Sequence, residues 1–527
     1  MKLATLSASG ALDRKAVDEW AFNTFALVES AGREAARVLV EAFPGYFPRA
    51  RLKGAPRAPR IAVFAGSGNN GADAMVLLRT LVLRGYAESA GSLVVTSRLP
   101  PEDEKTPGAL AFFSLVNMGA PAVLWNATGD FSGFDIIVDG ITGAGLSSPL
   151  KGAALAMAEE INRRKGALAV SVDIPSGCFD GWEPGMPIVK ADAVLAIEPV
   201  KACLYSPAAR PHSGAVLPVR GIFPRALVDA VRGPLLYGWK EASALVPPVA
   251  RTAYKYERGL VEIRAGSPGM AGAARIAARG AQAAGAGLVR LVVDPSIYPL
   301  LAGDAGGIMV VPDEGTSPPD PRAGRFVPAS MLLGPGWGRG PGRESLLDYA
   351  LQREEGGTPL VLDADAIALA GKRVFHGRTI VTPHPGEFAL WAGVPKEEAL
   401  SRPLPLLSRL AAERGAVILF KSHVLYAASP DGRTGVVDGM LPELGAGGSG
   451  DLLAGFCAAL AARRGCFEAA LAAAALLVET ASSSRPRFAD PLELAGRAAR
   501  IAGRAWLPGH YAGHDAPGKS GGREEER

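Results

Sequence analysis

The chain has 527 residues, which at roughly 150 residues per domain predicts two to four domains. Lysine and arginine number 56 and aspartate and glutamate 52, so the net charge of +4 is too small for a nucleic-acid-binding or membrane-surface protein. Glycine (65) and proline (42) are frequent, yet 48% of the residues are hydrophobic, which argues against a collagen-like or wholly disordered chain.

Cysteine usage and the N-terminal sequence predict a cytoplasmic protein. The four cysteines form no C-x-x-C pair and are too sparse for a disulfide framework or a thiolate zinc site. The first residues lack the apolar core of a signal peptide, and the apolar run 469–478 is about half as long as a bilayer requires. We therefore expect a soluble cytoplasmic protein that binds neither nucleic acid nor a membrane.

The first half of the chain alternates between strand-like and helix-like patterns. Apolar residues recur every three or four positions over 16–40, which predicts one amphipathic helix. The apolar runs that follow are typical of parallel strands covered by helices on both faces. We expect strands at 60–65, 92–95, 135–138 and 167–172, and helices at 73–84, 108–118 and 153–165.

The alternation lapses over about 225–258, which we interpret as the connection between two domains, and then resumes. We expect strands at 260–264, 288–293, 331–333, 359–363, 379–382 and 416–420, and helices at 271–285, 343–354, 405–414, 451–463 and 467–482. The glycine- and proline-rich span 302–328 is expected to be an irregular insertion, and the polar tail to be disordered. The fold class is α/β.

A glycine-rich turn, 66–71, follows the first strand and satisfies the G-x-G-x-x-G pattern of dinucleotide-binding folds. The match is weak because the next strand is followed by Ser97 and Arg98, where that pattern needs an acid for the ribose. The twin asparagines Asn69 and Asn70 offer oxygens to a ligand or hard cation, while the helix N-terminus offers N–H groups. A turn that only caps the helix is the alternative.

Two further strand ends carry aspartates, Asp139 and Asp173, each followed by a glycine-containing turn. Because ligands of open parallel sheets bind at the carboxyl ends of the strands, these residues could converge with Asn70 and Ser176 on one site. Simple helix caps are again the alternative.

In order and spacing, GSGNNGADA, VDGITGAGL, SVDIPSG and the segment from Lys201 to Leu204 resemble the epimerase domain of the bifunctional NAD(P)H-hydrate repair enzymes, over about 10–225. The resemblance implies a Rossmann-like three-layer sandwich, a potassium ion held by Asn70, Asp139 and Ser176, and Asp173 as the catalytic proton-transfer residue. The substrate residues that it implies are Asn69, Asn70, Gly71, Ala72, Asp73, Gly143, Ala144, Gly145, Leu146, Ser147, Ser148, Pro149 and Asp173.

Interconversion of the R and S hydrates needs ring opening, or loss and return of water at C6 of the nicotinamide. One positioned carboxylate acting on a bound water could catalyse it. The chain departs from the family pattern at Ala72 and Ala74, where glycine is usual, at Ala144, where threonine is usual, and at Ser30. A Cβ where backbone normally approaches the ligand could narrow the site, so a non-catalytic binding module is an alternative for this half.

A second glycine run, 445–450, opens a helix at Asp451. Bare N–H groups at a helix N-terminus suit a transferring phosphoryl group, and Asp451 could then be the general base that accepts a proton from the attacking hydroxyl. An aspartate that only favours the helix dipole is the alternative. The chain has no G-x-x-x-x-G-K-[ST] sequence, which argues against a P-loop nucleotidase.

GPGWG, LDADAIAL, TPHPGE, Lys421 and GSGDLLAG resemble the dehydratase domain of the same enzymes, a ribokinase-like three-layer sandwich, over about 255–505. The resemblance implies that ADP or ATP, with magnesium, phosphorylates the 6-hydroxyl and that phosphate elimination returns NAD(P)H. The residues that it implies are Ala273, Gly338, His384 and Asp451 for the substrate, and Lys421, Ser422, His423, Val424, Leu425 and Gly450 for the nucleotide, with Asp451 catalytic.

The expected organisation is an epimerase-like domain at 1–225, a linker at 226–254, a dehydratase-like domain at 255–510 and a disordered tail at 511–527. The protein is expected to act on NADHX and NADPHX and to be a homo-oligomer. Two alternatives stay open: a chain in which only the dehydratase half is active, and a ribokinase-like small-molecule kinase that keeps its phosphorylated product. The sequence leaves open ADP against ATP as donor and NADHX against NADPHX as substrate.

Overall fold

The computed structural model describes residues 1–47, 57–126, 131–303, 305–313, 327–483 and 489–507. They form two compact units. The first unit holds Met1–Leu236 with the segments His384–Leu410 and Phe420–Met440, and the second holds Tyr237–Pro383, Ala411–Leu419 and the chain from Leu441. The expected disordered tail and most of the expected insertion lie outside the described residues.

The first unit is built around a parallel sheet with the strand order β4-β3-β2-β5-β6-β7-β9. The chain moves outward from β2 in one direction and then continues from β5 in the other, so the strand order reverses between β2 and β5. Crevices at such a reversal are the usual ligand sites of open α/β sheets. The strands are β2 (Ile61–Ala65), β3 (Leu93–Thr96), β4 (Ala122–Leu124), β5 (Ile136–Gly140), β6 (Leu168–Val172), β7 (Ala193–Ile197) and β9 (Ala215–Val219).

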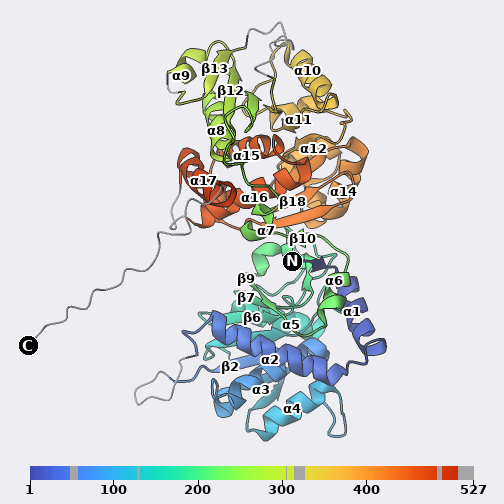
Figure 1. Ribbon diagram of the computed structural model, residues 1–527. Coiled ribbons are helices and arrows are strands. Elements are labelled where there is room, and N and C mark those ends of the chain that lie inside the picture. Colours follow the sequence, from blue (N-terminus) through green and yellow to red (C-terminus); the bar gives the residue numbers. More distant parts are fainter. Residues whose placement is uncertain (48–56, 127–130, 304, 314–326, 484–488, 508–527) are drawn as a thin grey trace, which may run out of the picture. The chain divides into compact units, whose positions relative to one another are not determined.

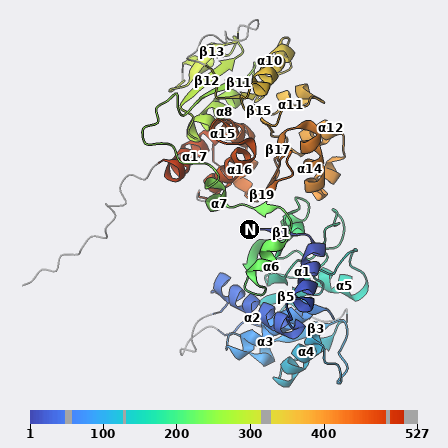
Figure 2. The same ribbon diagram turned by 45° about the vertical axis from the view of Figure 1, so that its right-hand side comes forward.

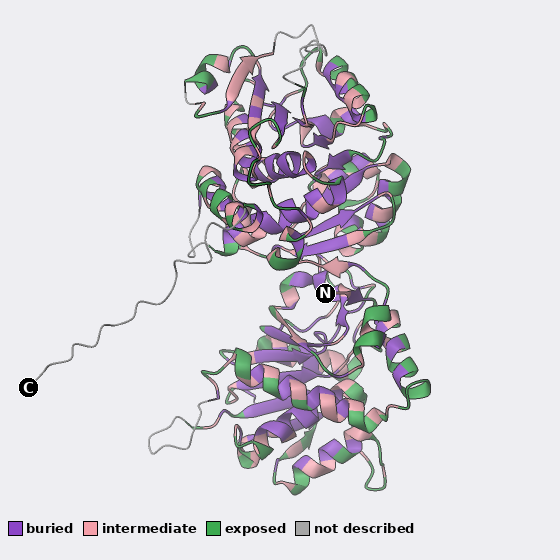
Figure 3. Cartoon of the chain, in the orientation of Figure 1, coloured by how far each residue is buried: buried purple, intermediate pink, exposed green. Residues whose placement is uncertain are grey.

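Helices cover both faces of this sheet (Figure 1). Alternate residues of β2 show the two faces: Val63 packs among α2 (Thr24–Ala42), α3 (Asn69–Leu83) and α4 (Pro107–Asn117), whereas Phe64 packs toward α5 (Gly152–Arg163). The inner strands β2, β3, β5, β6 and β7 are buried along most of their length, as strands covered on both faces must be (Figure 3). The α/β fold with its helix–sheet–helix layers is thus confirmed for this unit.

The N-terminal residues add a small second sheet that positions the site. β1 (Leu3–Ala4) pairs in parallel with β8 (Val200–Lys201), and α1 (Leu6–Asp18) follows directly. Thr5 caps α1 by accepting a hydrogen bond from the Ala8 N–H. The same unit contains α6 (Arg225–Ala230), β10 (Leu235–Leu236), and the antiparallel pair β18 (Val424–Ala428) and β19 (Thr434–Asp438).

The second unit is also built on parallel strands, in the order β16-β15-β14-β11-β12-β13 with β17 beside β16 (Figure 2). Its parallel sheet confirms the expected α/β class for this half as well. The strands are β11 (Leu260–Arg264), β12 (Leu288–Val293), β13 (Met309–Pro312), β14 (Ser330–Leu333), β15 (Leu360–Leu362), β16 (Thr379–Val381) and β17 (Val417–Phe420).

One face of this sheet is covered by small-residue helices that pack very closely. A Cβ on Gly455 of α15 would lie 2.1 Å from the Ala277 oxygen of α8, so glycine is required where these two helices cross. The Ser330 hydroxyl donates to the Ala458 oxygen at 2.7 Å and so ties α15 to β14. The helices of this unit are α7 (Trp239–Ser243), α8 (Ala271–Ala283), α9 (Tyr298–Ala302), α10 (Arg343–Glu355), α11 (Asp365–Ala370), α15 (Ser449–Ala461), α16 (Cys466–Ser482) and α17 (Pro491–Trp506). The segment His384–Leu410 of the first unit forms α12 (Pro385–Ala392), α13 (Lys396–Ser401) and most of α14 (Pro403–Arg414).

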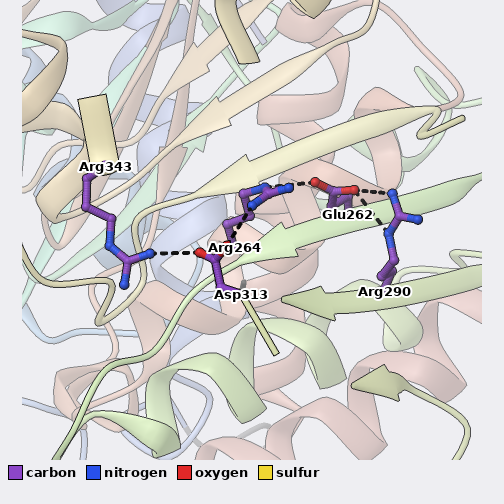
Figure 4. Close-up of polar contacts among 5 residues, drawn as sticks. All are labelled: Glu262, Arg264, Arg290, Asp313 and Arg343. Carbon is purple, nitrogen blue, oxygen red and sulfur yellow. Dashed lines mark hydrogen bonds and ion pairs between the residues drawn. The ribbon is translucent and has the colours of Figure 1, made fainter. Parts of the chain in front are cut away.

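The opposite face carries a buried charge network of two acids and three arginines (Figure 4). Glu262 Oε1 accepts from Arg264 Nε at 2.9 Å, and Glu262 Oε2 accepts from Arg290. Asp313 pairs with Arg264 at 3.4 Å and with Arg343, the first residue of α10, at 3.0 Å. Each carboxylate therefore has an arginine on both sides, which is the condition for burying such groups at tolerable cost.

Two expectations from the pattern are wrong. The helix expected over 16–40 is two helices, because Asn23 starts α2 as its N-cap and accepts from the Phe25 N–H at 2.8 Å. The expected irregular insertion contains β13, a short strand that pairs only with β12 and whose four residues are too few for a clear pattern. In the described parts of the chain, no helix combines the length and apolarity needed to span a membrane.

Candidate active sites

Three strand ends of the first unit bring their polar turns together, as the sequence predicts. Asn70 in the first turn of α3 donates from Nδ2 to the Thr142 oxygen at 2.9 Å. The Ser176 hydroxyl lies 3.2 Å from the same oxygen and accepts from the Thr142 N–H at 2.9 Å. The turns after β2, β5 and β6 thus converge at the reversal of strand order.

Asp139 lies beneath these turns and is completely buried. Its carboxylate accepts from the Ser171 hydroxyl at 2.7 Å, from the Ser176 N–H at 2.8 Å and from the Ser176 hydroxyl at 2.5 Å. Burial raises the pKa of Asp139 above its ordinary value, and the hydrogen bonds from Ser176 and Ser171 oppose that rise.

The oxygen atoms around Asp139 could act as ligands and fit a hard monovalent cation. Asn70, Asp139, Thr142 and Ser176 offer carbonyl, carboxylate and hydroxyl oxygens, without sulfur or imidazole ligands, within a few ångströms of one another. No group of three or more His, Cys, Asp or Glu is placed to hold a metal ion in the described ranges. The expected ligands Asn70, Asp139 and Ser176 therefore lie together in a set of oxygens that suits potassium better than a transition metal.

A cavity of about 1450 Å³ opens above these oxygen atoms within the first unit. Its volume exceeds the 300–1,000 Å³ or so that is common for drug-sized ligands, and so leaves room for a dinucleotide. Most of the substrate residues expected from the sequence line it: Asn69, Asn70, Asp73, Gly143, Ala144, Gly145, Leu146, Ser147, Ser148, Pro149 and Asp173.

Gly71 and Ala72, which were also expected to bind substrate, are absent from the cavity wall. A Cβ on Gly71 would lie 2.0 Å from the Gly66 oxygen, so this glycine serves the close packing of the turn. Ala72 and Ala74 are fully buried in the hydrophobic core between α3 and the sheet. Their methyl groups therefore do not narrow the cavity, and the argument for an inactive first half loses its structural basis at these two positions.

A buried ion pair forms part of the cavity wall. Lys201 Nζ donates to Asp173 Oδ1 at 2.5 Å and to the Ile197 oxygen at 2.9 Å. Both side chains are almost fully buried, with 2% and 6% of their residues' surface exposed. Asp173 has a φ of +66°, a conformation that costs energy for a residue with a side chain, and the surrounding turn holds it there.

Two more carboxyl groups face this pair, Asp73 from α3 and Asp13 from α1. Burial, followed by the charge of Asp173, raises the pKa of Asp73 well above its ordinary value. Asp13, Asp73, Asp173 and Lys201 are called the cavity cluster below. Lys201 belongs to one of the sequence motifs but had no expected role, and Asp13 was not expected at the site because α1 was not predicted.

The second unit places its glycine run at the start of α15. Gly448 precedes the helix with a φ of +96°, and Asp451 lies in the first helical turn. The Ser449 hydroxyl donates to the Leu444 oxygen at 2.9 Å and so fixes the entry of the run into the helix. The arrangement is that of an anion-binding helix N-terminus with a carboxylate inside it.

Loops at the carboxyl ends of β11, β14 and β15 surround the expected substrate residues Ala273 and Gly338. The Gly338 N–H donates to Asp365 at 2.9 Å, and the Ser267 hydroxyl donates to the Gly336 oxygen at 2.9 Å. A Cβ on Gly336 would meet the Ala273 Cβ at 3.0 Å, so the GPGWG turn lies directly on the start of α8. These strand ends are therefore held as one rigid surface.

The remaining expected residues lie in segments grouped with the first unit. His384 caps α12: its Nδ1 accepts from the Gly386 N–H at 3.0 Å and the Glu387 N–H at 3.2 Å, while its side chain stays exposed. In the neutral ring the proton is therefore on Nε2. The nucleotide residues Lys421 to Leu425 form the connection from β17 into β18, where the Ser422 hydroxyl donates to the Val424 oxygen at 2.5 Å.

Comparisons with known proteins agree with both halves. The family described as "YjeF-related protein N-terminus" matches residues 24–203, and the family "NAD(P)H-hydrate dehydratase" matches residues 261–492. The bifunctional NAD(P)H-hydrate repair enzyme of Salinibacter ruber is 31% identical over 517 residues, covering 91% of each chain. That of Escherichia coli is 29% identical, covering 85% of this chain and 82% of its own.

Among solved structures, the ADP/ATP-dependent NAD(P)H-hydrate dehydratase of Bacillus subtilis, co-crystallised with ATP and Mg²⁺, is 24% identical with a TM-score of 0.46. It covers 52% of this chain and 98% of its own.

The two parallel-sheet units, one with a dinucleotide-sized cavity and one with a glycine-rich helix N-terminus, define a two-part α/β enzyme. The chain belongs to the family of bifunctional NAD(P)H-hydrate repair enzymes, with both the epimerase-type and the dehydratase-type domain present. The family inferred from the sequence motifs is thereby confirmed.

Proposed function

We propose that this chain repairs hydrated nicotinamide nucleotides: its N-terminal half interconverts R- and S-NAD(P)HX, and its C-terminal half dehydrates the S form to NAD(P)H at the expense of ADP or ATP. The observation that carries the proposal is the Asp173–Lys201 pair in a cavity of dinucleotide size, at the reversal of strand order. Membership of a family whose relatives are named bifunctional NAD(P)H-hydrate repair enzymes supports it.

For the epimerase reaction, Asp173 is the proton-transfer group and the cavity residues around 69–73 and 143–149 hold the nucleotide. Lys201 keeps the Asp173 carboxylate in one place while the reacting carbon is bound next to it. Asn70, Asp139 and Ser176 would hold the potassium ion. A cation there would position oxygens of the substrate and offset phosphate charge.

For the dehydratase reaction, Asp451 is the general base toward the 6-hydroxyl, and the N–H groups at the start of α15 stabilise the transferring phosphoryl group. Ala273, Gly338 and His384 contact the hydrate, and Lys421 to Leu425 with Gly450 contact the nucleotide. A magnesium ion bound with the nucleotide would neutralise phosphate charge.

The same proposal includes the residue ranges of the two domains, the cellular location of the protein, its oligomeric state and its substrates. The epimerase domain spans 1–225, the linker 226–254 and the dehydratase domain 255–510. The protein acts in the cytoplasm as a homo-oligomer on NADHX and NADPHX.

The test gives the purified full-length chain a mixture of R- and S-hydrate with ADP or ATP, and follows the return of nicotinamide absorbance. Full recovery is expected. A plateau at the S fraction, with no gain over spontaneous epimerisation, would contradict the epimerase half, and a phosphorylated product without phosphate release would favour the kinase alternative. Asp451→Asn should abolish recovery while nucleotide binding stays largely intact; near-normal turnover by this variant would contradict the role of Asp451.

A further inference from the structure

One oxygen of the cavity cluster has no hydrogen-bond partner. Asp73 Oδ1 is buried without a partner within the described residues, and only 8% of this residue's surface is exposed. Asp73 nevertheless lines the cavity. Leaving a buried polar atom unpaired costs free energy, so such an atom in a folded protein requires an explanation, and a catalytic role is one.

The charges around Asp73 explain its state. Besides burial, the charges of Asp173 and Asp13 raise the pKa of Asp73, and the charge of Lys201 lowers it. The ammonium of Lys201 contacts Asp173, not Asp73, at 2.5 Å. Asp13 is exposed and has Arg14 beside it, whereas Asp73 is buried. Burial and the negative charges raise the pKa of Asp73 well above its ordinary value.

We propose that Asp73 is the acid that complements Asp173 in the epimerisation: Asp73 protonates the hydroxyl that leaves C6 of the hydrate, and Asp173 deprotonates the water that adds to the opposite face. This inference rests on the proposed epimerase function and assigns its second catalytic group. Two carboxyl groups whose surroundings separate their protonation states are the usual arrangement for paired acid and base catalysis.

The steps balance in atoms and electrons. The N1 lone pair of the hydrated ring forms a C6=N1 double bond, the C6–O bond breaks with its electron pair on oxygen, and that oxygen takes the proton of Asp73 and leaves as water. A second water then attacks C6 from the other face, the C6=N1 electrons return to N1, and the proton of this water passes to Asp173. The net change is inversion at C6 and the shift of one proton from Asp73 to Asp173.

The enzyme is then ready for the reverse direction, with Asp173 as acid and Asp73 as base. Exchange of one proton with solvent restores the first state. Because the reaction from this state needs the proton on Asp73, the rate should fall at high pH, where Asp73 is ionised.

The test measures interconversion of purified R- and S-NADHX by the full-length chain without ADP or ATP, so that the dehydratase reaction is silent. Asp73→Asn keeps the size of the side chain and its hydrogen-bonding capacity but cannot transfer the proton. It should lower kcat by about 10²–10⁴ while KM changes less than about threefold, and it should remove the alkaline limb of the pH profile.

The matched control is Asp135→Asn, which removes a negative charge of the first unit outside the cavity wall. Asp135 accepts from the Arg60 N–H at 2.7 Å, and asparagine can accept this bond equally. The control should keep kcat within about threefold of the wild type. A kcat of Asp73→Asn within that range, or a loss that is confined to KM, would overturn the acid role of Asp73.

The same experiment separates this inference from the proposed function. If the wild-type chain does not exceed spontaneous epimerisation, the epimerase function and the inference both fall. If the wild type epimerises and Asp73→Asn does so equally well, only the inference falls.

Discussion

The protein has two clusters of charged side chains with buried members, and they differ in how completely the buried charges are paired. In the charge network of the second unit, Glu262 and Asp313 each lie between two arginines. In the cavity cluster of the first unit, Lys201 pairs with Asp173, and within the described part of the chain Asp73 Oδ1 has no hydrogen-bond partner.

The difference in pairing indicates that the charge network has a structural role and the cavity cluster a chemical one. A network in which every carboxylate is paired can hold β11, β12, β13 and α10 together, but it has no group left to react. An incompletely paired cluster that borders a large cavity costs stability and keeps a transferable proton. Removing a charge should therefore mainly lower stability in the charge network and mainly lower the epimerisation rate in the cavity cluster.

The largest expected effect is on stability, from Glu262→Gln. The variant leaves Arg264 and Arg290 buried without their carboxylate and should lower the free energy of unfolding of the second unit by about 3–5 kcal/mol. Urea unfolding followed by tryptophan fluorescence measures this. Glu493→Gln, which removes an exposed helix pair with Arg497, is the control and should cost less than about 1 kcal/mol. Equal losses in the two variants would show that the network is not a structural element.

The next largest effect is expected from Lys201→Met, on the rate of epimerisation. Without the ammonium, the Asp173 carboxylate loses its fixed position, and kcat should fall about 100-fold with little change in KM. Because the charge of Lys201 lowers the pKa of Asp73, its removal should also move the alkaline limb of the pH profile to higher pH. Lys201→Arg keeps the charge and should recover part of the rate, whereas Lys190→Met, at an exposed position, should have no effect. Loss of rate in Lys201→Met with an unchanged pH profile would indicate a merely structural lysine.

Asp73→Asn should stabilise the first unit and at the same time abolish most of its epimerase activity. The pKa of Asp73 is raised in the folded protein, so the folded state binds more protons than the unfolded state between the two pKa values, and stability falls as pH rises through that range. Asparagine removes this dependence and should add about 1–2 kcal/mol to the free energy of unfolding at neutral pH. Thermal unfolding at pH 4 and pH 7 checks the sign; a variant less stable than wild type at pH 7 would contradict it.

The smallest effect is expected from Asp13→Asn. The negative charge of Asp13 contributes to the raised pKa of Asp73, so its removal should shift the alkaline limb of the epimerisation profile to lower pH. The rate at the optimum should change by less than about threefold, because Asp13 takes no part in proton transfer. An alkaline limb that moves to higher pH would contradict the electrostatic account of the cavity cluster.

The sequence predicts most of the fold, because parallel strands covered on both faces are continuous apolar runs. The strands at 61–65, 136–140 and 168–172 lie where apolar runs predict them. α1 was missed because its sequence of small and polar residues has only a few buried positions, and it is held by contacts with Leu227 and Val231 far along the chain. Such contacts have no local signal.

The site was predictable in part for the same reason. Asn70, Asp139, Asp173 and Ser176 follow strand ends, and parallel topology alone brings such residues together. The Asp173–Lys201 pair depends on β1 pairing with β8, and the missing partner of Asp73 depends on everything packed around it. Neither property can be read from residue types at a given spacing.

The central claim is that Asp73 keeps its proton at neutral pH, and infrared spectroscopy tests it directly. The difference spectrum of wild type minus Asp73→Asn should contain the carbonyl band of a protonated carboxyl group. Asp135→Asn is the control. Burial raises the pKa of Asp135, but hydrogen bonds from Arg60 and Arg57 outweigh burial and hold this pKa below its ordinary value. The difference spectrum of wild type minus Asp135→Asn should therefore contain only carboxylate bands. If the Asp73 difference spectrum instead lacks the carbonyl band of a protonated carboxyl group and contains a carboxylate band, the account is contradicted.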